Sequence, residues 1–125
     1  MKGWAEERVV KELGYLNEQT RPHGLEKESH YSRHLNFLRW LNRTFSKKVK
    51  IIDIGGGSGT LLHTILSYEK SPFKMDEFEN YSCYDLNSYC IENGKETFKD
   101  YQNVKFIEQD LDNHPIKEKV DVVYV

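Results

Sequence analysis

The sequence predicts an α/β protein in which helices cover both faces of a parallel sheet. Short apolar runs typical of buried strands alternate with helical segments from about residue 49 to the last residue. Amphipathic segments with no strand-like run precede them, and a cluster of glycines follows the first predicted strand. Alternation of strands and helices is typical of a parallel sheet joined by right-handed crossovers.

Two helices are predicted before the first strand. Residues 4–19 have apolar side chains at helical spacing, and residues 21–24, Arg-Pro-His-Gly, interrupt the pattern. The second helix is predicted from about Lys27 or Ser29 to Phe45. Its apolar stripe consists of Tyr31, Leu35, Leu38 and Leu41. We therefore divide the chain into a helical segment, residues 1–46, and an α/β unit, residues 47–125.

The α/β unit contains about four predicted strands, which makes the sheet incomplete for a Rossmann-like fold. The strands are predicted at 49–54, 81–85, 104–108 and 120–125, with helices at 58–68 and 88–99. Residues 71–80 look like a polar surface elaboration at the amino ends of the strands. The last strand is apolar and is expected to have a neighbour on each edge. Either the sequence is part of a longer protein, or a homodimer or another partner completes the sheet.

Composition narrows the class of protein. The chain is 38% hydrophobic and 30% charged, with a net charge of −2, as expected for a soluble globular protein. This charge does not favour nucleic acid as a partner. No apolar run reaches the roughly 18 residues of a membrane span, and nothing resembles a signal peptide, so we expect a cytoplasmic protein without a membrane association. Cys83 and Cys90 are expected to be reduced and buried.

The histidines do not predict a metal site. His30 and His34 are four residues apart and share a helix face, as a metal-binding pair would. No third ligand follows at a useful spacing, and a solvated or substrate-facing helix is the preferred interpretation.

The glycine cluster predicts a ligand-binding loop. Residues 53–59 read Asp-Ile-Gly-Gly-Gly-Ser-Gly, directly after an apolar strand. In parallel sheets the loops after the strands face the ligand, and glycine allows the backbone to approach it closely. A dinucleotide fingerprint starting at Gly55 needs a third glycine at position 60, where the chain has Thr60. A phosphate-binding loop needs a lysine that is missing here. A glycine-rich turn without a ligand is the remaining alternative.

This sequence resembles the class I S-adenosylmethionine-dependent methyltransferases. Residues 53–59 look like the first motif of that family, residues 84–87 like its ribose-binding segment, and residues 103–111 like its third motif. The resemblance covers about residues 31–125 and implies S-adenosylmethionine as the cofactor. The residues that it implies for cofactor binding are Asp53, Gly55, Gly56, Gly57, Gly59, Asp85, Leu86, Asp110 and Leu111.

The resemblance also implies methyl transfer to an unidentified acceptor, and the composition favours a small molecule over nucleic acid. It names no catalytic base, because the residues that usually face the methyl group follow the fourth strand. Residues 1–46 would act as a lid over the cofactor, and Tyr31 and His34 would then reach the substrate. The alternatives are a non-catalytic, methyltransferase-like module that pairs with itself or a partner subunit, and half of an NAD-binding domain.

Overall fold

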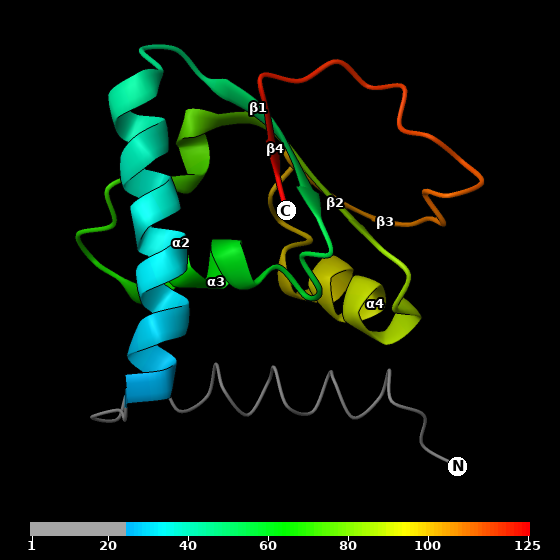
Figure 1. Ribbon diagram of the computed structural model, residues 1–125, viewed down its shortest axis with the longest axis horizontal. Coiled ribbons are helices and arrows are strands. Elements are labelled where there is room, and N and C mark those ends of the chain that lie inside the picture. Colours follow the sequence, from blue (N-terminus) through cyan, green and yellow to red (C-terminus); the bar gives the residue numbers. More distant parts are fainter. Residues whose placement is uncertain (1–24) are drawn as a thin grey trace.

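The computed structural model describes residues 25–125, with side chains from Ser32 onward (Figure 1). The helix predicted over residues 4–19 lies outside the described residues. Within them, helices and strands alternate as the sequence predicts. The elements are α2 (Leu25–Thr44), β1 (Val49–Ile54), α3 (Thr60–Ser67), the 3₁₀ helix η2 (Met75–Glu77), β2 (Phe78–Asp85), α4 (Ser88–Thr97), β3 (Val104–Glu108) and β4 (Val122–Tyr124).

The four strands form one parallel sheet with the order β3-β2-β1-β4. This confirms the predicted α/β class and the incomplete, Rossmann-like sheet of four strands. The register sets Ile54 of β1 opposite Tyr84 of β2, and Asp53 opposite Tyr124 of β4. The carboxyl ends of the strands therefore lie at the same end of the sheet, where the loops that follow them are close together.

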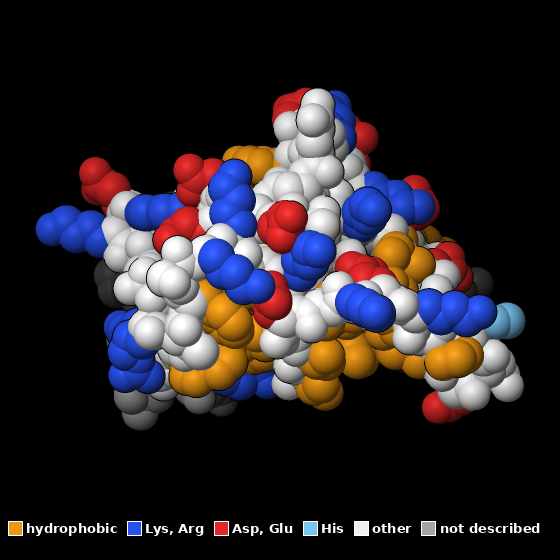
Figure 2. All heavy atoms as spheres, turned by 90° about the horizontal axis from the view of Figure 1, so that it is seen from above, with side chains coloured by type: hydrophobic (Ala, Val, Ile, Leu, Met, Phe, Trp, Pro, Cys, Tyr) orange, Lys and Arg blue, Asp and Glu red, His pale blue; other side chains and the backbone are white. Residues whose placement is uncertain are grey.

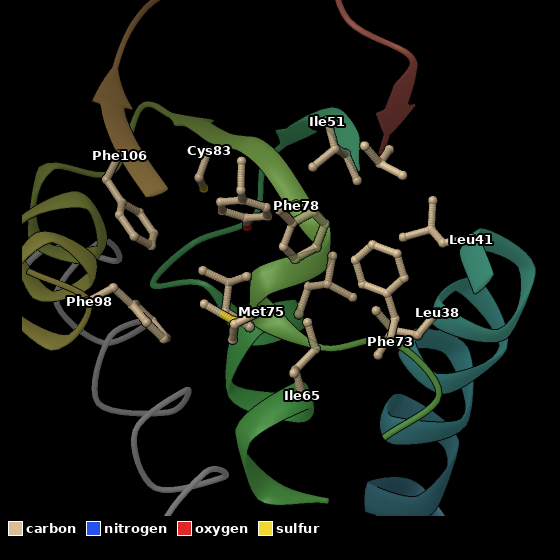
Figure 3. Close-up of a cluster of buried hydrophobic side chains, with 14 of the residues drawn as sticks. Leu38, Leu41, Ile51, Ile65, Phe73, Met75, Phe78, Cys83, Phe98 and Phe106 are labelled. Carbon is tan, nitrogen blue, oxygen red and sulfur yellow. The ribbon is translucent and has the colours of Figure 1, made fainter. Parts of the chain in front are cut away.

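One face of the sheet carries the hydrophobic core. Side chains alternate between faces along a strand, so Ile51, Tyr81 and Phe106 point to the same side. Figure 3 shows Leu38 and Leu41 of α2, Ile65 of α3 and Phe98, the residue after α4, in one cluster with Ile51 and Phe106. Leu38 and Leu41 of α2 are fully buried in this cluster, so α2 and the sheet share one core.

The opposite face carries Ile52, Ser82 and Tyr84, which are all buried. Among residues 25–125, the segment that bonds to this face through its side chains is the connection between β3 and β4, residues 109–121. This connection is the loop drawn from orange to red in Figure 1. The described helices join the core on the first face only, and the second helical layer that we predicted is not seen in this part of the chain.

The connector before β2 belongs to the core, which corrects the prediction of a surface elaboration. Phe73 is 2% exposed, Met75 8% and Phe78 1%. The rings of Phe73 and Phe78 pack with centroids 4.8 Å apart, and η2 lies against α3. Because Phe78 already pairs with Val49, β2 begins three residues earlier than predicted. The apolar side chains are spaced irregularly among polar ones, so neither helical nor strand periodicity reveals their burial.

The β4 strand lies at an edge of the sheet, with β1 as its neighbour. Val123 is 51% exposed and Val125 is 86% exposed.

Figure 2 shows a band of hydrophobic side chains on one face of the molecule, bordered by lysine, arginine and acidic side chains.

None of the helices within residues 25–125 combines the length and the hydropathy needed to cross a lipid bilayer.

Replacing Phe73 by alanine tests the role of the connector. Because Phe73 is buried among core side chains, we expect Phe73→Ala to lower the free energy of unfolding by about 3–5 kcal/mol, measured by urea denaturation. Lys70→Ala, at the exposed residue just before this connector, is the control and should change the free energy of unfolding by less than about 0.5 kcal/mol. Equal effects of the two substitutions would show that the connector is peripheral.

Candidate functional site

The loop after β1 depends on glycine at alternate positions. Gly55, Gly57 and Gly59 have φ angles of 71°, 62° and 88°, in the left-handed region that side chains disfavour. Gly59 also begins α3, because its carbonyl accepts the N–H of His63 at 2.9 Å. The alternating glycines thus turn the chain sharply from the end of β1 into the first turn of α3. We call residues 55–59 the glycine loop.

The glycine loop is bonded to the end of β2. The N–H of Gly55 donates to the carbonyl of Tyr84 at 2.8 Å. The N–H of Gly57 donates to Oδ2 of Asp85 at 3.0 Å, and the N–H of Asn87 donates to Oδ1 of the same carboxylate at 2.9 Å. Asp85 is 7% exposed. One carboxylate therefore joins the glycine loop to the turn that starts α4.

Asp53 lies beneath the glycine loop. A Cβ atom on Gly56 would lie 2.5 Å from Oδ2 of Asp53, so only glycine allows the loop to rest on this carboxylate. The hydroxyl of Tyr81, itself fully buried, donates a hydrogen bond to the same oxygen. Burial raises the pKa of Asp53 to about 6, although the bond from Tyr81 opposes this shift.

A cavity of about 280 Å³ opens at the carboxyl ends of β1, β2 and β3. It contains five of the nine predicted cofactor-binding residues: Gly55, Asp85, Leu86, Asp110 and Leu111. Leu86 is 64% exposed and presents an apolar side chain at the cavity. The other residues that line the cavity are Ile54, Tyr84, Gln109 and Asp112. The remaining predicted residues do not line the cavity. Gly56, Gly57 and Gly59 belong to the glycine loop, and Asp53 lies beneath this loop.

Asp110 shapes the rim of the cavity. Its Oδ1 accepts the N–H of Asp112 at 3.0 Å, and its Oδ2 accepts the side-chain amide of Asn113 at 2.6 Å. The preceding Gln109 donates its N–H to the carbonyl of Asp85 at 3.2 Å. The turn after β3 is thus attached to the end of β2, as the glycine loop is on the other side.

His34 is buried against the edge strand. It is 4% exposed, and a hydrogen bond of 2.8 Å joins its Nδ1 to the hydroxyl of Tyr124. Phe37 stacks on the same tyrosine ring with centroids 3.9 Å apart. These contacts fix α2 to β4. Contact between His34 and a substrate stays a prediction, and the side chain of Tyr31 lies outside the described residues.

Two tyrosines of the site were missed in the sequence. Tyr84 lines the cavity and Tyr81 bonds to Asp53. Position along the strand offered a signal for Tyr84, which directly precedes Asp85 at the carboxyl end of β2. Cys83 and Cys90 are buried and form no disulfide, as expected. Residues 25–125 contain no group of three or more His, Cys, Asp and Glu side chains that could hold a metal ion.

No family model matches the chain. In sequence, the chain is 26% identical over 76 residues to prosolanapyrone synthase from Alternaria solani. The aligned region covers 61% of this chain and 3% of that protein. In structure, the chain is similar to coclaurine N-methyltransferase bound to N-methylheliamine and S-adenosylhomocysteine, with a TM-score of 0.52 and 18% sequence identity. The match covers 72% of this chain and 26% of that one.

The fold also matches protein arginine methyltransferase 10 from Arabidopsis thaliana, with a TM-score of 0.51 and 16% identity. This match covers 80% of the present chain and 29% of the other, so the chain spans less than a third of either solved structure. The described residues therefore have the fold of class I methyltransferases.

The buried carboxyl of Asp53 predicts a pH dependence of stability. Its pKa is higher in the folded chain than in the unfolded one, so the folded state binds more protons between about pH 4 and pH 6. The free energy of unfolding of the wild type, minus that of Asp53→Asn, should fall by roughly 2–3 kcal/mol as the pH rises through this window. Urea denaturation at several pH values measures it, and a difference that does not change with pH would contradict the buried acid.

Proposed function

We propose that this chain is the cofactor-binding part of an S-adenosylmethionine-dependent methyltransferase. The observation that carries the proposal is the cavity at the carboxyl ends of β1, β2 and β3, with the glycine loop on one side and Asp85 at its base. Ligands of open parallel sheets bind outside these strand ends. The fold shared with methyltransferases supports this choice of ligand, and coclaurine N-methyltransferase is a solved relative in fold that holds S-adenosylhomocysteine.

The cavity suits the adenosine end of the cofactor. A carboxylate has about four acceptor sites, so Asp85 can accept ribose hydroxyl protons while it also accepts N–H groups. The exposed Leu86 offers an apolar surface for the adenine ring, which would explain why such a side chain faces the cavity. Asp110 and Leu111 would lie along the edge of the base.

The glycine loop suits the methionine end. No atom lies within 4 Å of the position that a Cβ atom on Gly55 would take, so the backbone there faces open space that a ligand can enter. The first turn of α3 follows directly, and the positive end of a helix dipole favours a carboxylate. Any side chain at Gly55 would fill this space and would also strain a φ of 71°.

Bound S-adenosylmethionine supplies an activated methyl group on a sulfonium, whose departure as a thioether needs little chemical assistance. The residues of this chain would then hold and align the cofactor and exclude water from it. The net charge of −2 favours a small-molecule acceptor over nucleic acid. The buried thiols fit a reducing, cytoplasmic location. A lid formed by residues 1–46 would have to leave α2 in place, because Leu38 and Leu41 are buried in the core.

The edge strand supports a second candidate function. The exposed Val123 and the open edge of β4 would suit a non-catalytic module that pairs with a second copy of the chain. Sedimentation of the full-length protein tests this candidate. A dimer that dissociates when Val123 is replaced by lysine would favour it, and a monomer would exclude self-association.

Binding of S-adenosylhomocysteine by the full-length protein tests the proposed function. Isothermal titration should show binding, and Leu86→Ala should weaken it by about five- to thirtyfold, as loss of about 1–2 kcal/mol of apolar contact predicts. Leu66→Ala is the matched control, because Leu66 is 51% exposed and lies away from the cavity on α3. This control should bind like the wild type.

Three results would contradict the proposal. The first is no binding by the wild type. The second is equal binding by wild type and Asp85→Ala, since the carboxylate lies at the base of the cavity. The third is tighter binding of NAD than of S-adenosylhomocysteine, which would instead favour a dinucleotide site despite Thr60 at the position of the third glycine.

A further inference from the structure

The connection between β3 and β4 forms part of the cavity wall. Further along, it bonds to the face of the sheet opposite the hydrophobic core. Its first residues, Gln109 to Asp112, line the cavity. Further along, Oε1 of Glu118 accepts a hydrogen bond from the hydroxyl of Ser82 at 2.9 Å, and Oε2 accepts one from the hydroxyl of Tyr84 at 2.9 Å. A single carboxylate thus attaches a long connection without regular structure to β2.

The two hydroxyl groups come from buried residues of β2. Ser82 is 1% exposed and Tyr84 is 6% exposed, so both hydroxyls need a hydrogen-bond partner from the protein. The phenol of Tyr84 is protonated near neutral pH and can donate, and burial and the carboxylate of Glu118 raise its pKa to about 12. The two oxygens of one carboxylate match these two donors.

Tyr84 connects this attachment to the proposed binding site. Tyr84 is one of the residues that line the cavity, and its hydroxyl donates a hydrogen bond to Glu118. Its carbonyl accepts the N–H of Gly55, so the same residue also holds the glycine loop. The wall formed by Gln109 to Asp112 is bonded to β2 at its start, where the N–H of Gln109 donates to the carbonyl of Asp85. Release of Glu118 from Ser82 and Tyr84 would loosen this wall from its other end, while the glycine loop stays in place.

We propose that Glu118 is a positioning residue that holds the cavity wall formed by Gln109 to Asp112 in the arrangement that binds the adenosine end of the ligand. The proposal rests on the function proposed above. Ordering a mobile wall at the moment of binding lowers affinity, and a wall that is already held in place avoids this loss. Loops longer than about 12 residues without secondary structure are uncommon and are often functional, which fits a connection of this kind.

The test compares Glu118→Ala and Tyr84→Phe with Lys117→Ala in the full-length protein. Tyr84→Phe removes the hydroxyl that bonds to Glu118 and keeps the aromatic ring. Lys117 is the matched control, because it is the exposed neighbour of Glu118 in the same connection. The first measurement is hydrogen exchange of the amides of residues 109–114 without ligand, and the second is the dissociation constant of S-adenosylhomocysteine by titration.

We expect faster exchange and a dissociation constant about three- to tenfold higher in Glu118→Ala and in Tyr84→Phe, with the control unchanged. The double variant should bind no more weakly than the weaker single variant, because both substitutions break the same contact. A general loss of stability would instead lower the unfolding midpoint of each variant and make their effects add.

Unchanged exchange in Glu118→Ala would overturn the inference, and so would faster exchange with unchanged binding. In both cases, binding by the wild type would leave the proposed function intact. Failure of the wild type to bind S-adenosylhomocysteine would overturn the proposed function and, with it, this inference. Binding by the wild type therefore distinguishes a failure of the inference alone from a failure of both.

Discussion

The site depends on hydrogen bonds that attach the glycine loop to the end of β2. The N–H of Gly55 reaches the carbonyl of Tyr84, and the N–H of Gly57 reaches the carboxylate of Asp85. These bonds are possible because β1 and β2 are parallel neighbours that end at the same level, with Ile54 opposite Tyr84. Without them, the loop and the second strand would not share one cavity wall, and the proposed ligand would lose its support on two sides.

Holding the glycine loop requires polar groups in places that otherwise favour apolar side chains. Asp53 is buried under the loop and is stabilised by the hydroxyl of Tyr81, while Asp85 accepts backbone N–H groups. The nearby charge of Asp85 adds to the burial that raises the pKa of Asp53. Burying such groups destabilises a fold unless they are hydrogen-bonded, and these bonds offset that loss. The loop is held through the N–H groups of Gly55 and Gly57, and the backbone of Gly55 faces open space that a ligand can enter.

Regular patterns in the sequence were sufficient for the sheet but not for its connections. The strands at 49–54 and 104–108 have the predicted bounds, because short apolar runs between turn residues indicate buried strands. The buried connector at 71–80 has no such period, and its core residues were missed. For the site, the family resemblance implied nine residues, and five of them line one cavity. Glu118 was missed, because a lone acidic residue in a polar loop carries no local signal of its two partners on β2.

The central claim is that a nucleoside ligand binds where the glycine loop and the ends of β2 and β3 meet. The most direct test is to add S-adenosylhomocysteine to isotopically labelled full-length protein and follow its amide resonances. We predict that the largest shifts fall on residues 55–59, 85–87 and 109–112, around the cavity. No shifts, or shifts centred on the opposite end of the sheet around Tyr68, Glu79 and Gln102, would contradict the account.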